Sequence, residues 1–176
     1  MPLTTYTAGE VLTAASLNAN FSFAAGGAPM ALFREEQAAG TYAGTATTGA
    51  WATRVLNTTV TNGITGCSLA SSQVTLPAGT YYVYGITPAY GGTGGTQCRL
   101  YNITDSAAIG YGLNCPNGNV GSGVFSELDY YFTLAASKVI ELQMRVQYSV
   151  ATDGLGTRTN WGNVEVYSEL TITKVA

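Results

Sequence analysis

Alternation between apolar and polar residues with a period of two, which runs through almost every segment after Met30, constrains the fold of this chain more than any other feature. Glycine, threonine, asparagine and proline separate the alternating segments, as turns separate short strands. A chain with about nine or ten such strands and almost no helix is predicted to be all-β, a jelly-roll β-sandwich built from two sheets.

Three segments in the second half of the chain show the alternation most clearly. Residues 138–148 place on one face Ile140, Leu142, Met144, Val146 and Tyr148. Residues 126–134 do the same with Leu128, Tyr130, Phe132 and Leu134, and residues 163–175 with Val164, Val166, Leu170 and Ile172. The short link Ala135–Ser137 predicts that the first two of these strands form an antiparallel hairpin. We expect the last strand to occupy a central position in its sheet.

Length, composition and charge indicate the size of the domain and exclude some classes of partner. The 176 residues suffice for one domain plus an arm, and 22 glycines and 12 tyrosines suit twisted strands joined by tight turns. The net charge of -3, with only seven Lys and Arg, predicts no nucleic-acid partner. No apolar run is long enough for a membrane span, so no membrane partner is predicted, and we expect no secretory signal.

Cysteine chemistry is limited to three residues, Cys67, Cys98 and Cys115, which form no metal-type CxxC pair. Two states stay open: a bridge between Cys98 and Cys115 with Cys67 free, or three free thiols as in cytosolic assembly. No acidic run with calcium-loop spacing is present. We therefore predict no metal and no cofactor.

Catalytic candidates are few, because the chain contains no histidine. The segment GGTGGT (91–96) lacks the strand-then-helix context of a phosphate loop. Two carboxylate pairs, Glu127 with Asp129 and Glu165 with Glu169, are predicted to lie on solvated outer faces of strands. Glu35 and Glu36, next to Arg34, are expected in surface or inter-chain ion pairs. The prediction is a protein that is not an enzyme.

Aromatic residues in or near glycine-rich loops are the better candidates for binding. Tyr90, Tyr111 and Trp161, with Trp51, are predicted contacts for a glycan or a protein partner, because a ring with a polar edge can stack on either. The alternative is that Trp51 and Tyr111 cap the core and that tyrosines on strand faces fill subunit contacts.

The first 25 residues follow a different pattern, that of one short amphipathic helix. Thr13 is its predicted N-cap, with Leu12 and Leu17 at the spacing of a hydrophobic staple and Phe21 continuing the stripe. Asn18 lies beside that stripe and is a candidate for bonding to partner backbone. A helix of about eight to ten residues needs a surface to pack on, either its own β-domain or another protein.

Two motifs resemble a known family. Residues 6–21, YTAGEVLTAASLNANF, resemble the amino-terminal motif of many tailed-bacteriophage structural proteins, where such a stretch precedes an appendage domain. VTLPAGTYYVYG, CRLYNITD and VYSELTITKV resemble the complement and tumour-necrosis-factor-like jelly rolls of phage knobs, fibres and decoration proteins. Those domains are typically trimers.

The resemblance implies a virion protein whose partners are its own copies, as a homotrimer, and other phage structural proteins. It implies an attachment arm at residues 1–25, a linker and first strand at 26–50 and a jelly-roll β-sandwich at 51–176. The knob would lie on the tail, where host surface glycans are candidate partners, or on the head as a decoration protein. A carbohydrate-binding, lectin-like module is the alternative.

Overall fold

The computed structural model describes residues 5, 7–10, 13, 27–116 and 123–175. Within these residues it contains eleven strands and one short 3-10 helix, η1 (Gly91–Thr93). Every strand-to-strand pairing of the two sheets is antiparallel. The all-β prediction is confirmed.

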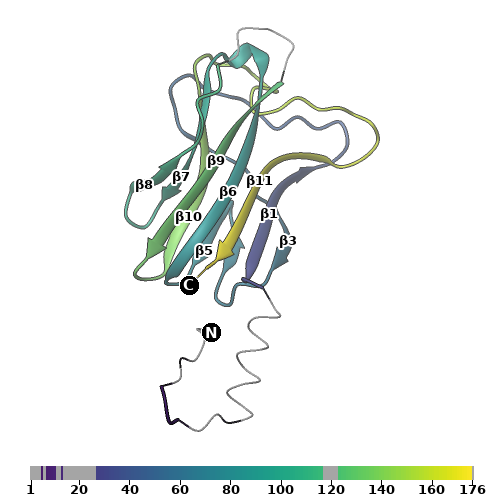
Figure 1. Ribbon diagram of the computed structural model, residues 1–176. Coiled ribbons are helices and arrows are strands. Elements are labelled where there is room, and N and C mark those ends of the chain that lie inside the picture. The colour runs from purple at the N-terminus through teal and green to yellow at the C-terminus, as the bar shows by residue number, and fades with distance from the viewer. Residues whose placement is uncertain (1–4, 6, 11–12, 14–26, 117–122, 176) are drawn as a thin grey trace.

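One sheet has five strands in the order β3-β1-β11-β6-β9. Their bounds are Thr58–Asn62 (β3), Met30–Gln37 (β1), Glu165–Lys174 (β11), Gly79–Tyr90 (β6) and Gly123–Leu134 (β9). The terminal strand β11 lies in the middle of this sheet, between β1 and β6, as predicted. Figure 1 shows these strands running side by side.

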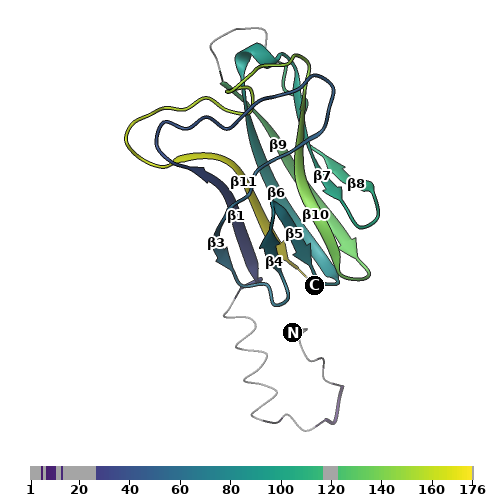
Figure 2. The same ribbon diagram turned by 180° about the vertical axis from the view of Figure 1, so that it is seen from behind.

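The other sheet has six strands, five of them in the order β4-β5-β10-β7-β8, while β2 pairs with β10. Their bounds are Ala52–Thr53 (β2), Ser68–Ala70 (β4), Gln73–Leu76 (β5), Thr96–Asn102 (β7), Ala107–Tyr111 (β8) and Lys138–Val146 (β10). The reverse view in Figure 2 shows these strands, with β10 between β5 and β7.

The core lies between the two sheets and takes its side chains from the inward positions of the alternating strands. Its fully buried members include Phe33, Val74, Val83, Leu100, Leu128, Ile140, Leu142, Leu170 and Ile172. The predicted apolar faces are therefore confirmed from Ile140 to Val146 and at Leu128 and Leu134. Tyr148 lies beyond the end of β10 and is exposed.

The predicted hairpin between residues 126–134 and 138–148 is wrong. Strand β9 pairs with β6 in the five-stranded sheet, whereas β10 pairs with β5 and β7 in the other sheet. The link Ala135–Ser137 therefore crosses from one sheet to the other. The physical reason is that Leu134 and Ile140 both face the shared core, and each strand finds its hydrogen-bonding partners within its own sheet.

The predicted apolar face of the last strand is wrong over its first half. Val164 and Val166 are exposed, while Glu165, Tyr167 and Ser168 are buried. The register explains this, because Arg34 pairs with Glu169 but Glu36 pairs with Val166, so two residues of β11 lie opposite Glu35. This β-bulge reverses the inward and outward positions along the strand.

A buried ion pair lies at the bulge. The Arg54 Nη2 atom is 2.8 Å from Glu35 Oε2, and both side chains are fully buried. Arg54 Nε donates to Ser168 Oγ at 2.6 Å, and the Arg54 backbone N–H donates to the Leu142 carbonyl of β10. Arg54 thus joins the two sheets. The expected surface or inter-chain position of Glu35 is wrong, because the alternation of β1 turns Glu35 inward together with Ala31 and Phe33.

The arm residues Leu12, Leu17, Asn18 and Phe21 lie outside the described residues, so their roles stay predictions. Thr13 is described and exposed, and its capping role also stays a prediction. Residues 27–29 lead into β1 at the end of the sandwich where the chain also finishes, since Met30 pairs with Thr173.

We predict that Arg54→Met lowers the free energy of unfolding by about 3–5 kcal/mol, because it leaves the Glu35 carboxylate buried without its partner. The double variant Glu35→Leu with Arg54→Met should recover most of that loss, since it removes both charges. Urea unfolding measures both values. A single variant as stable as the unsubstituted protein would contradict the assigned role.

Candidate functional site

The outer face of the five-stranded sheet is rich in aromatic and aliphatic side chains. The alternation of β6 turns Tyr81, Val83 and Gly85 inward, so that the strand presents outward Tyr82, Tyr84, Ile86, Pro88 and Tyr90. Isoleucine, proline and tyrosine in outward positions are unusual for a solvated sheet, where this face is normally polar.

Strand β9 extends this face on one side of β6. Tyr131 pairs with Tyr82, and their ring centroids are 4.8 Å apart. Phe125 lies opposite Pro88. Tyr131 and Phe125 are 65% and 56% exposed, although both are large and largely apolar. Exposed rings that continue one face over two strands mark a surface suited to contact with another protein.

The charged groups on the same face are divided between its two halves. Glu127 and Asp129 lie on β9, opposite Ile86 and Tyr84. Burial, and after it the charge of the Glu127 carboxylate, raises the pKa of Tyr84. Arg34 lies on β1 and pairs with Glu169, with Nε and Oε2 2.5 Å apart. The β9 half is therefore acidic, and the β1 half contains an ion pair.

The predicted acidic pairs differ in environment. Glu127 and Asp129 share the outer face, as expected. Glu165 is instead buried and accepts the backbone N–H groups of Thr159, Asn160 and Gly40. These hydrogen bonds, those of Thr159 and Asn160 first, hold the pKa of Glu165 at about 2. This carboxylate fixes a loop and does not share an outer face with Glu169.

The three predicted aromatic contacts are not gathered into one site among the described residues. Tyr90 ends β6 in the five-stranded sheet, and Tyr111 ends β8 at the edge of the other sheet. Trp161, 82% exposed, lies in the loop before β11 that Glu165 holds. Tyr111 is paired with Trp51, their ring centroids being 6.0 Å apart.

The outer face of the six-stranded sheet contains a cluster of two arginines around Trp51, called the Trp51 cluster below. The guanidinium carbon of Arg99 lies 4.1 Å from the Trp51 ring centroid, and that of Arg145 lies 4.9 Å from it. Arg99 also lies 4.2 Å from the centroid of the Tyr101 ring. Trp51 thus covers two arginines on the outer face and does not cap the core. The sequence contained a signal for this cluster, the alternation of Gln97, Arg99 and Tyr101.

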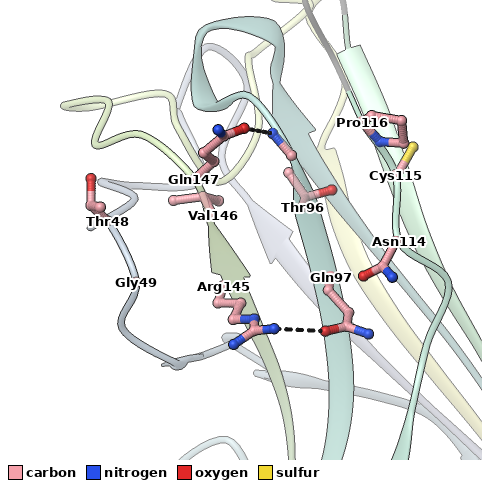
Figure 3. A pocket seen from close by; sticks show the side chains of 11 residues that line it. Thr48, Gly49, Thr96, Gln97, Asn114, Cys115, Pro116, Arg145, Val146 and Gln147 are labelled. Carbon is pink, nitrogen blue, oxygen red and sulfur yellow. Dashed lines mark hydrogen bonds between the residues drawn. The ribbon is translucent and has the colours of Figure 1, made fainter.

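An open pocket of about 470 Å³ adjoins this cluster at the end of the sandwich where β7 begins and β10 ends. Figure 3 shows Thr48 and Gly49 on one side and the segment 114–116 on the other, with Gln97 and Arg145 between them. Cys115 lines this pocket. It is one of three free thiols, and Cys98 is buried, so the structure contains no bridge between Cys98 and Cys115.

Among the described residues there is neither a helix long and apolar enough to span a membrane nor a group of three or more potential metal-ligating side chains.

Comparison with known proteins gives the fold. No family model matches the chain, and no curated protein matches it. Among solved structures, PRD1 vertex protein P5 is 15% identical, with 85% of this chain and 98% of that chain covered and a TM-score of 0.54. Murine APRIL at pH 5.0 is 10% identical, covering 84% and 99%, with a TM-score of 0.56. The globular domain of zebrafish complement 1qA protein is 12% identical, covering 85% and 98%, with a TM-score of 0.50.

These likenesses define the class of the protein, a jelly-roll β-sandwich, and confirm the predicted fold. At 10–15% identity they establish the fold alone.

Proposed function

We propose that this chain is a non-enzymatic structural protein of a phage virion, a homotrimeric jelly-roll knob attached to the particle through its amino-terminal arm. The observation that carries the proposal is the outer face of the five-stranded sheet, with Ile86 and Pro88 on β6 and the exposed rings of Phe125 and Tyr131 on β9. Exposed rings and aliphatic side chains gathered on one sheet face favour burial against another protein.

The occupant of this face is a second copy of the chain. Its two halves are unlike, since the β9 half is acidic and aromatic and the β1 half contains the Arg34–Glu169 ion pair. Contacts between unlike patches run head to tail and close into rings when the rotation permits. The number three comes from the resemblance to complement and tumour-necrosis-factor-like jelly rolls. Tyrosine is among the residues most enriched at such interfaces.

Attachment to a particle is supported by the position of the first strand and by the arm motif. The chain enters β1 at the same end of the sandwich as its last strand finishes. The pocket beside Arg145 lies at the other end. A solved structure with the same fold bears the name of a vertex protein. The virion protein that the arm contacts decides whether the knob lies on the head or on the tail of the particle.

A non-enzymatic role is supported by three carboxylates that bond to groups of the protein itself. Glu35 is buried against Arg54, Glu165 accepts loop N–H groups, and Glu169 pairs with Arg34. Carboxylates engaged in this way are partners of the fold and are not free to exchange protons with a substrate.

The second candidate function is a carbohydrate-binding, lectin-like module, which the pocket beside Trp51 and Arg145 favours. Glycan binding by the protein lacking residues 1–25, together with absence of the full-length chain from particles, would support this alternative.

We expect the purified protein to have about three times the chain mass of 18.3 kDa by light scattering. Tyr131→Asp should shift it to the monomer mass, because a carboxylate would be buried in the contact. Tyr111→Asp is the matched control, since Tyr111 is similarly exposed (57%) but lies on the other sheet. A monomer that persists at high concentration without substitution would contradict the trimer.

We expect mass spectrometry to detect the chain in purified particles of the phage that encodes it, and Leu17→Asp or Phe21→Asp to abolish its incorporation. Each change removes about 2 kcal/mol of apolar burial and adds the desolvation of a carboxylate. Ala19→Asp, on the opposite side of the predicted helix, is the control and should incorporate normally. Absence of the chain from particles would refute the virion role, whereas a lowered melting temperature of Leu17→Asp would show that the helix packs on its own domain.

A further inference from the structure

Two arginines on the six-stranded sheet have no carboxylate partner. The ion pairs among the described residues are Arg34–Glu169, Arg54–Glu35 and Lys138–Asp105, so neither Arg99 nor Arg145 is in one. The chain as a whole has a net charge of -3. Two neighbouring unpaired guanidinium groups therefore form a local positive patch on an otherwise acidic protein.

The two guanidinium groups are held in place by neutral side chains. Arg99 Nε donates to Gln143 Oε1 at 2.8 Å, and Arg145 Nη2 donates to Gln97 Oε1 at 3.2 Å. Trp51 packs against both groups. These contacts fix the orientation of the side chains without neutralising their charge.

Glu141, the carboxylate nearest to Arg145 in the sequence, bonds to other side chains. Glu141 accepts hydrogen bonds from Thr53 Oγ1, Gln73 Nε2 and Gln143 Nε2, at 2.7–2.8 Å. Within the described residues, both Nη groups of Arg99 and the Nε and Nη1 groups of Arg145 donate no hydrogen bond. An arginine normally uses such donors in parallel pairs on a carboxylate or phosphate.

The pocket supplies the other half of a binding site. Its volume of about 470 Å³ lies in the range of small-ligand sites, and its polar lining comes from Thr48, Gln97, Asn114, Arg145 and Gln147. Amide and hydroxyl groups both donate and accept, as sugar hydroxyls require. Tyr111, 57% exposed and paired with Trp51, offers an aromatic surface next to Arg99, its cross-strand neighbour.

We propose that this pocket binds an acidic saccharide, with the sugar carboxylate on Arg145, its hydroxyls on Gln97, Asn114 and Gln147, and Arg99 contributing positive potential. A neutral sugar would leave the arginines unpaired, and a nucleic acid would need many more cations than two. The inference names the ligand of the second candidate function. It is independent of the subunit contact, which lies on the other sheet.

The test is calorimetric titration with oligomers of galacturonate, oligomers of alginate and a sialylated trisaccharide, each against its uncharged methyl ester. We expect at least one acid to bind and its ester, equal in shape, to bind about tenfold or more weakly, as loss of a charged hydrogen-bond partner implies. Binding should also weaken as salt is raised.

Variants locate the binding. Arg145→Gln should weaken it about tenfold or more and Arg99→Gln by less, whereas Arg158→Gln, an exposed arginine of another loop, should leave it unchanged. The mass in solution should be the same for all three. Binding of none of the acids, equal binding of acid and ester, or an unchanged affinity in Arg145→Gln would each overturn the proposal. So would equally tight binding of inorganic sulfate, which would indicate a general anion site.

Discussion

The stacking of the two sheets depends on Arg54, which is buried between them together with its ion-pair partner Glu35. Its backbone N–H group bonds to β10, and its side chain bonds to Glu35 of β1 and Ser168 of β11. The bulge in β11 places Ser168 inward, where its hydroxyl accepts the hydrogen bond from Arg54. The register between β1 and β11 and the position of the ion pair therefore depend on each other. At the opposite edge Ser126 has a similar role, since its hydroxyl accepts from the Cys98 N–H and donates to the Leu113 carbonyl. Polar links at both edges fix which side chains each sheet presents outward.

The two outer faces that result have different chemistry. The five-stranded sheet presents tyrosine, phenylalanine and isoleucine, suited to burial against a copy of the chain, whereas the six-stranded sheet presents arginines held by Trp51 and by glutamines. A single sandwich can therefore assemble through one face and keep the other free for a ligand. The ends of the sandwich are also distinct, because the chain enters at one end and the pocket lies at the other. Attachment and recognition would then occur at opposite ends of the knob.

Alternation was enough to predict the all-β class and the three clearest strands, although not which residues face the core in the first half of the last strand. The central position of the last strand was also predicted. They could not predict which strands pair. The link Ala135–Ser137 is short enough for a hairpin, yet it crosses between sheets, since pairing is decided by contacts distant in sequence. The bulge at Ser168 turned Val166 outward and Tyr167 inward, the reverse of the predicted orientation. Neither the composition nor the alternation of the segment indicates that one strand has an extra residue there. The Trp51 cluster was missed because Trp51 and Arg145 are far apart in the chain and meet only in the sheet.

Hydroxyl-radical footprinting of the protein in solution, read out by mass spectrometry at each tyrosine and tryptophan, reports which sheet face is covered by a second copy of the chain. Tyr82 and Tyr131 lie on the proposed subunit contact, whereas Tyr111 lies on the other sheet and Trp161 in an exposed loop. The account predicts slow oxidation of Tyr82 and Tyr131 and fast oxidation of Tyr111 and Trp161, although Tyr131 is 65% exposed in the single chain. Oxidation of Tyr131 as fast as that of Tyr111 at a concentration where the protein is assembled would contradict it.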